Sequence, residues 1–164
     1  ARVYYDREQF AQSFVLFEKV KESSAGNQKA DAFYHQALIR QKQELYDSSN
    51  ALVNKMIEAL PSYREWKMKA LVLMARNFWK LDDIFQANYI IDFIINSNEN
   101  AELVAEAKAL RTEINEAEAR AIAEKEALLR KQASPITLDE EGDLKFLDAP
   151  GSEEPLEEPE VIEK

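Results

Sequence analysis

Residues 78–94 read FWKLDDIFQANYIIDFI, and this stretch contains the spacing that decides the fold. The small residue Ala87 follows Ile84 after three residues, Ile91 comes four residues later, and Ile94 three after that. Steps of three and four residues place all four side chains on one face of an α-helix. A small residue within that face lets two helices cross closely, because a larger side chain would hold their axes apart. We therefore expect a helix that packs tightly on a neighbour.

The same spacing occurs twice earlier in the chain, in residues 4–20 and 40–56. The first bulky positions are Phe10, Tyr46 and Ile84, which are separated by 36 and 38 residues. The equivalent later positions are small (Ser13, Ser49, Ala87) and then bulky (Phe17, Val53, Ile91, followed by Val20, Met56, Ile94). A pattern that recurs at such a period indicates an internal repeat of helix pairs.

The composition of the first 132 residues favours helices throughout. They contain one glycine and one proline, Gly26 and Pro61, and are rich in Ala, Leu, Glu, Lys and Gln. Polar clusters and breakers predict helices over about 10–23, 28–43, 47–59, 63–80, 82–96 and 100–132. We expect Asp82 and Asp83 to cap the fifth of these.

This pattern resembles the tetratricopeptide repeat, a family of helix pairs about 34 residues long. The third unit carries the resemblance in Leu71, Met74, Ala75 and Phe78, and in the run Lys80-Leu81-Asp82-Asp83-Ile84-Phe85-Gln86-Ala87. The second unit carries it in Phe33, Ala37, Tyr46, Ser49, Val53, Met56 and Pro61. The chain departs from the family in its turns, where Glu8, Glu44 and Asp82 replace the usual glycine.

The resemblance implies an all-α solenoid in residues 1–99, with units of about 1–26, 27–61 and 62–99. The helix over 100–132 would cap it. A generic α-solenoid or helical bundle is the alternative. The final helix and the acidic end are, more narrowly, similar to large repeat lipoproteins of the bacterial envelope, including those of type IX secretion and gliding motility. That likeness favours the bacterial periplasm or envelope over the cytoplasm. Because the chain starts at Ala1 without Met or signal segment, we expect a fragment of a longer protein.

In this family the first helix of each unit lines a concave groove. The register carried over implies these partner-binding residues: Tyr5, Tyr34, Lys42, Lys69, Arg76, Trp79 and Lys80. The same register also places Arg2, Asp6, Asp31, Leu38, Gln41 and Val72 toward the groove. Aromatic side chains among cations suit an acidic or amphipathic peptide. An ordinary amphipathic rim is the alternative. The family's two-carboxylate clamp is not reproduced, so we do not expect binding of chaperone C-termini.

Catalysis is not expected from this sequence. The chain has no cysteine and a single histidine, His35, so neither a thiol nucleophile nor a usual metal-ligand set is present. No Gly-rich phosphate loop or Ser–His–Asp signature occurs, and we predict no cofactor and no metal. Residues 1–132 carry 20 acidic and 19 basic residues, a balance that argues against general nucleic-acid binding. No apolar stretch approaches the roughly 20 residues of a membrane span.

The acidic excess of the chain is concentrated in residues 133–164. These hold eleven acidic residues and two lysines, a net charge of −9 out of −10 for the whole chain. Within them Ile136, Leu138, Leu144 and Phe146 alternate with polar residues, which predicts a small β-hairpin or a linear motif at 136–147. We expect this segment to dock on a partner. A solubilising disordered end is the alternative reading of the Pro- and Glu-rich tail.

The function expected from these features is a non-catalytic scaffold for protein–protein interaction, the C-terminal repeat segment of a larger assembly protein. The first alternative is a co-chaperone or regulatory module that captures peptides in the groove. The second is an enzyme whose chemistry lies upstream, with this part positioning substrate. The expected partners are proteins or peptide segments.

Overall fold

A computed structural model describes residues 1–97, 100–132, 136–138 and 144–146 of the chain. These residues form seven helices and one pair of short strands, so the predicted all-α fold is confirmed for the body of the chain. The contacts divide the chain into two units, Ala1–Ala117 and Glu118–Lys164. Each unit is described by itself below.

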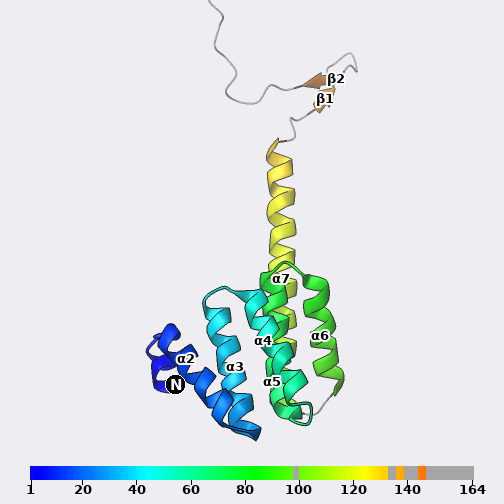
Figure 1. The fold of residues 1–164 in the computed structure, drawn as a ribbon. Helices are drawn as coiled ribbons and strands as arrows, with labels where there is room; N and C mark the ends of the chain where they lie inside the picture. Colours follow the sequence, from blue (N-terminus) through cyan, green and yellow to red (C-terminus); the bar gives the residue numbers. More distant parts are fainter. Residues whose placement is uncertain (98–99, 133–135, 139–143, 147–164) are drawn as a thin grey trace, which may run out of the picture. The chain divides into compact units, whose positions relative to one another are not determined.

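The helices of the first unit follow the predicted boundaries closely (Figure 1). They are α1 (Arg2–Asp6), α2 (Phe10–Ser23), α3 (Gly26–Lys42), α4 (Tyr46–Ala59), α5 (Arg64–Lys80), α6 (Ile84–Ser97) and the beginning of α7 (Ala101–Gln132). The start of α3 was predicted two residues late, because Gly26 belongs to the helix instead of the preceding break. At the start of α7, the Asn100 side chain accepts hydrogen bonds from the backbone of Glu102 and Leu103.

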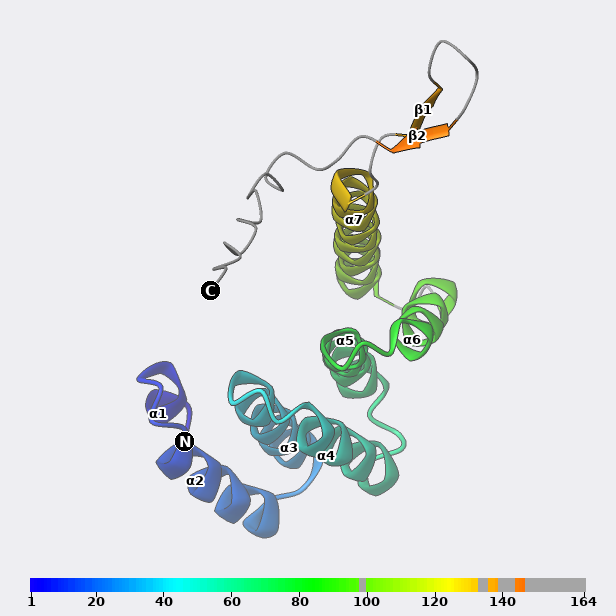
Figure 2. The same cartoon turned by 90° about the horizontal axis from the view of Figure 1, so that it is seen from above.

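The helices of this unit pack in two layers. Figure 2 shows α1, α3, α5 and the beginning of α7 along the inner side of a curve, with α2, α4 and α6 along its outer side. Successive helices contact one another from α1 through α6. Two ion pairs join α7 to both layers, Arg76 of α5 with Glu113 at 3.3 Å and Asp92 of α6 with Arg111 at 2.7 Å. In the arrangement of Figure 2, the inner layer consists of the first helix of each pair and the beginning of α7.

The turns between paired helices share one geometry. Glu8, Glu44 and Asp82 have φ values of 58°, 60° and 62°, the only non-glycine residues with positive φ in the described part of the chain. Each donates its N–H to the carbonyl three residues before, at 2.9–3.1 Å. The next residue donates to the carbonyl five residues before, at 2.9 Å in all three turns. This is the left-handed helix end that normally carries glycine.

Helix α6, the fifth of the helices predicted from the sequence, is capped by one of the two predicted residues. Asp83 Oδ1 accepts a hydrogen bond from the Gln86 backbone N–H at 3.0 Å. The expectation that Asp82 also caps α6 was wrong. Asp82 has a left-handed φ of 62° and lies in the turn that follows α5. One aspartate therefore closes the first helix of the pair and the other opens the second.

The second and third positions of the predicted packing row are buried in all three pairs, whereas the first positions, Phe10, Tyr46 and Ile84, are half-buried. The small positions Ser13, Ser49 and Ala87 are each 0% exposed. Phe17, Val53 and Ile91, one turn further along each outer helix, are no more than 2% exposed. Each outer helix therefore crosses its partner at a small residue and fills the space beyond it with a bulky one.

Buried polar side chains join adjacent pairs. Asn77 of α5 is 0% exposed and donates to Ser49 and Asn50 of α4, at 2.8 Å each, while its oxygen accepts from Gln41 of α3 at 2.7 Å. Gln36 of α3 is also 0% exposed. Its amide donates to Glu18 at 2.6 Å, and its oxygen accepts from Lys21 at 3.3 Å. Among the described side chains, no buried nitrogen or oxygen lacks a hydrogen-bond partner.

Helix α7 changes character along its length. Leu103, Ala107, Leu110 and Ile114 are at most 6% exposed and belong to the main core, as predicted for a capping helix. In the second unit, all described side chains from Glu118 to Lys131 are exposed. The second unit also contains β1 (Ile136–Leu138) and β2 (Leu144–Phe146), which pair antiparallel with Ile136 opposite Phe146. This pairing confirms the predicted hairpin, while the remainder of the predicted acidic tail lies outside the described residues.

Candidate binding surfaces

The inner layer contains a hollow of about 580 Å³ between α1, α3 and α5, called here the aromatic hollow. Its lining comprises Arg2, Tyr5, Asp6, Asp31, Tyr34, His35, Trp66 and Lys69. The rings of Tyr34 and Trp66 lie 5.9 Å apart at an angle of 58°. His35 meets the rings of Tyr5 and Tyr34 edge-on, at 5.6 and 5.9 Å. The hollow therefore combines ring faces with a few polar groups.

The charges of the aromatic hollow are largely paired. Arg2 donates to Asp31 at 2.6 Å, and His35 Nδ1 lies 3.2 Å from the same carboxylate and 2.9 Å from the Asp31 carbonyl oxygen. The Lys69 ammonium lies 5.4 Å from the centre of the Trp66 ring, within reach of a cation–π attraction. With two acidic and two basic residues in its lining, this hollow suits an uncharged aromatic or apolar side chain.

The two tyrosines of the aromatic hollow stay neutral over the physiological pH range. Burial, with smaller contributions from the negative charge of Glu106 and from Tyr5, raises the pKa of Tyr34 to about 12. Burial and the neighbouring Asp6 carboxylate raise the pKa of Tyr5 as well. Both hydroxyls are therefore protonated and can donate a hydrogen bond.

A second hollow of the inner layer, of about 230 Å³, is called here the basic hollow. It is lined by Gln41, Lys42, Glu44, Tyr46, Arg76 and Lys80. Three cations thus face one carboxylate within the lining, a balance that favours an anionic group. The Arg76 guanidinium is also 3.3 Å from Glu113, but both side chains are substantially exposed, so that ion pair is weak.

The structure brings together most of the residues predicted for the groove, in two places. Tyr5, Tyr34 and Lys69 line the aromatic hollow, and Lys42, Arg76 and Lys80 line the basic hollow. Trp79 lines neither. It is half-buried against the main core, with the Lys80 ammonium 4.6 Å from its ring centre. Leu38 is likewise partly buried in the core. The expectation for Val72 was wrong, because α5 is enclosed by its neighbours and leaves this side chain only 3% exposed.

Trp66 and Tyr46 were not predicted as hollow residues. Trp66 lies one helical turn before Lys69 on α5, so the spacing of three residues could have placed it on the same face. Its indole N–H donates to Asn27 at 3.2 Å. Tyr46 had been assigned only to the packing row, and the half-exposed start of α4 brings it into the basic hollow.

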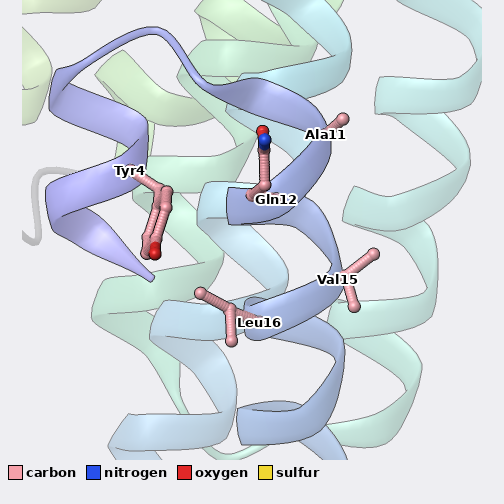
Figure 3. Close-up of a pocket in the computed structure, with 5 residues that line it drawn as sticks. All are labelled: Tyr4, Ala11, Gln12, Val15 and Leu16. Carbon is pink, nitrogen blue, oxygen red and sulfur yellow. The ribbon is translucent and has the colours of Figure 1, made fainter.

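A third hollow, of about 530 Å³, lies beside the first two helices and is called here the N-terminal hollow. Figure 3 shows Tyr4 projecting from α1 beside four residues of α2, namely Ala11, Gln12, Val15 and Leu16. Tyr4 is 40% exposed and Val15 is 56% exposed. None of these five residues is among those that the sequence analysis predicted for the groove.

The outer layer exposes a row of three aromatic residues on α6. Phe85, Tyr89 and Phe93 follow one another at steps of four and are 77%, 66% and 46% exposed. The equivalent residues are Ala11, Val15 and Lys19 on α2, and Asp47, Ala51 and Lys55 on α4, and all six are exposed. The fold thus does not require aromatic residues at these outward positions.

Within the described residues, no group of three or more His, Cys, Asp or Glu side chains could hold a metal ion. No helix of this part of the chain is long and apolar enough to cross a membrane. No protein-family model matches the chain, and neither the curated proteins nor the solved structures give a match.

Proposed function

We propose that residues 1–117 are a solenoid of tetratricopeptide-like helix pairs that serves as a non-catalytic scaffold for protein–protein interaction. The recurrence of three features supports the repeat: the left-handed turns at Glu8, Glu44 and Asp82, the buried small residues, and the buried bulky row. Each unit of such an array exposes its first helix on the inner side, where a partner segment can lie.

The observation that carries the proposed binding role is the pairing of two unlike hollows on the inner layer. The aromatic hollow offers rings, tyrosine hydroxyls and balanced charges, whereas the basic hollow offers three cations. Aromatic and arginine side chains dominate the binding energy of protein interfaces. A partner segment with an aromatic or apolar residue and a separate carboxylate matches these two sites. The likeness to envelope lipoproteins makes assembly of secretion machinery the narrower form of this proposal.

Charge-reversal variants test the inner layer directly. We immobilise the full chain and two variants of it, Lys69→Glu and Arg76→Glu. Quantitative mass spectrometry then compares the proteins that each of them retains. The matched control is Lys55→Glu, which changes the same charge on the exposed outer face of α4. We expect retained partners to fall about tenfold or more in the two inner variants, the loss expected when a central contact is removed. Equal retention by all four proteins would show that the inner layer does not bind.

Peptide capture is the second candidate, and the surplus of cations in the basic hollow favours it. A receptor for short segments keeps its binding when residues 133–164 are deleted but loses it in Arg76→Glu. A scaffold that also docks through Ile136, Leu138, Leu144 and Phe146 loses partners on that deletion. The deletion therefore separates the two candidates.

A further inference from the structure

We propose that the aromatic row of α6, formed by Phe85, Tyr89 and Phe93, is the contact through which two copies of this chain form a two-fold dimer. The three side chains are 77%, 66% and 46% exposed. Residues four apart are neighbours on a helix surface, so the three rings form one continuous strip. Helix α6 lies on the outer side of the curve in Figure 2 and lines neither hollow of the inner layer.

The exposure of this row does not depend on where the chain begins or ends. Asp47, Ala51 and Lys55 are the equivalent residues on α4, and all three are exposed. Helix α4 belongs to the central pair, with one helix pair before it and another after it. A neighbouring pair on either side therefore leaves these positions uncovered. Stacking of further helix pairs does not explain why α6 carries aromatic residues here.

The order of residues in the row favours a second copy of the chain as its partner. Phe85 and Phe93 lie four residues on either side of Tyr89, which is about 6 Å along the helix axis. A two-fold axis near Tyr89 brings this residue beside its counterpart and each Phe85 opposite the second copy's Phe93. The same patch then serves both copies, as a two-fold dimer requires. Tyrosine suits the centre, because its ring packs while its hydroxyl can form a hydrogen bond.

The area of the row is large enough to contribute most of such an interface. At the observed exposures its three side chains present about 400 Å², and two facing rows present about 800 Å². Stable interfaces bury at least about 1,200 Å² in total, and the exposed Asp92 and Asn96 on the same face of α6 extend the contact. Asp92 is paired with Arg111 at 2.7 Å, which reduces repulsion between the carboxylates of two copies.

A membrane surface fits this face poorly. Helices that lie on a lipid surface carry Lys or Arg beside their apolar face. Among the exposed residues that the structure describes on α6, the one charged residue is Asp92. The charge of this face therefore favours a protein contact over an anionic lipid surface.

Sedimentation equilibrium of the full chain over the micromolar range tests the proposal. We expect the mass to rise with concentration from that of one copy to that of two. Tyr89→Lys should weaken the dimer at least about tenfold, because it places two like charges at the centre of the contact. Ala51→Lys, the same change at the equivalent position of α4, is the matched control and should dimerise like the parent. Both positions are exposed, so both variants should keep the circular dichroism of the parent.

A mixing experiment tests the two-fold contact itself. Tyr89→Glu alone should dimerise as weakly as Tyr89→Lys, whereas an equimolar mixture of the two should dimerise, because unlike charges then meet. The proposal is overturned if the parent is monomeric throughout, if Tyr89→Lys dimerises like the parent, or if the mixture stays monomeric. It is also overturned if dimers form only after residues 133–164 are deleted, since the cover would then belong to the same chain.

Discussion

The side-chain amide of Asn77 on α5 donates a 2.8 Å hydrogen bond to the hydroxyl of Ser49 on α4. Ser49 in turn donates to the Ala37 carbonyl on α3, also at 2.8 Å. A chain of hydrogen bonds thus links three helices inside the first unit. Because both side chains are 0% exposed, no water can replace a partner that is removed.

Asn77→Leu should lower the free energy of unfolding by about 2 kcal/mol, since it leaves the buried groups around it without a donor or acceptor. Urea unfolding followed by circular dichroism measures the change. Asn54→Leu is the matched control on the exposed face of α4 and should shift stability by less than about 0.5 kcal/mol. Equal losses in the two variants would argue that the network contributes nothing specific.

Ala87→Leu should destabilise the protein by about 1–3 kcal/mol, because the side chain enters the closest approach of two helices. Ala87 is 0% exposed, whereas Ala51 on α4 is exposed. Ala51→Leu therefore provides the same change without overpacking and should be nearly neutral. Thermal unfolding of both variants compares them, and a neutral Ala87→Leu would contradict the role given to the small position.

Glu44→Gly should raise the free energy of unfolding by about 0.5–1 kcal/mol. The φ of 60° at Glu44 is costly for a residue with a Cβ and is adopted freely by glycine. Ala51→Gly is the control within α4, where the same loss of a side chain should cost about 1 kcal/mol. Urea unfolding should therefore show a higher free energy of unfolding for Glu44→Gly and a lower one for Ala51→Gly. A loss of stability in both variants would contradict the cost assigned to the left-handed φ of Glu44.

The Glu18 carboxylate makes stability depend on acid pH. Hydrogen bonds from Gln36 and then Lys21 hold its pKa below the ordinary 4.5. A lowered native pKa contributes stability above the unfolded pKa, and that contribution is lost as the pH falls through the native value. Glu18→Gln should therefore be less stable than the parent at about pH 7 and lose less stability on acidification to about pH 3.

The measurement for Glu18 is urea unfolding at both pH values. Glu22→Gln removes an exposed carboxylate from the same helix and serves as the control. Its loss on acidification should match that of the parent. If Glu18→Gln also matches the parent at both pH values, the contact with Gln36 does not contribute to folding.

Much of the fold could be predicted because the spacing of apolar and small residues along a helix indicates which side chains are buried. The spacing of Ser13, Ser49 and Ala87 identified the positions where helices cross, and each is fully buried. The alternation of Ile136, Leu138, Leu144 and Phe146 indicated a hairpin or a linear motif, and the structure pairs the two strands. Asp82 received two assignments, a helix cap and the turn position where the family has glycine, and its φ of 62° agrees with the second.

The candidate site was harder to predict than the fold. A register can place Tyr34 or Lys69 on the inner layer, but it does not report how far a neighbouring helix covers each residue. Val72 fits the register and is nevertheless buried, because α5 is surrounded by other helices. Trp66 was missed because the family pattern gave its position no role, although it supplies a large ring of the aromatic hollow.

On α2, α4 and α6, the inward and outward residues differ in how strongly the fold constrains them. The inward residues of each helix maintain the crossing, while the outward ones vary from Ala11 to Asp47 to Phe85 within one chain. Because the side chains of this outward row are exposed, substitutions there should leave the packed core unchanged. The outward side chains of each helix can therefore change without affecting the residues at which the helices cross.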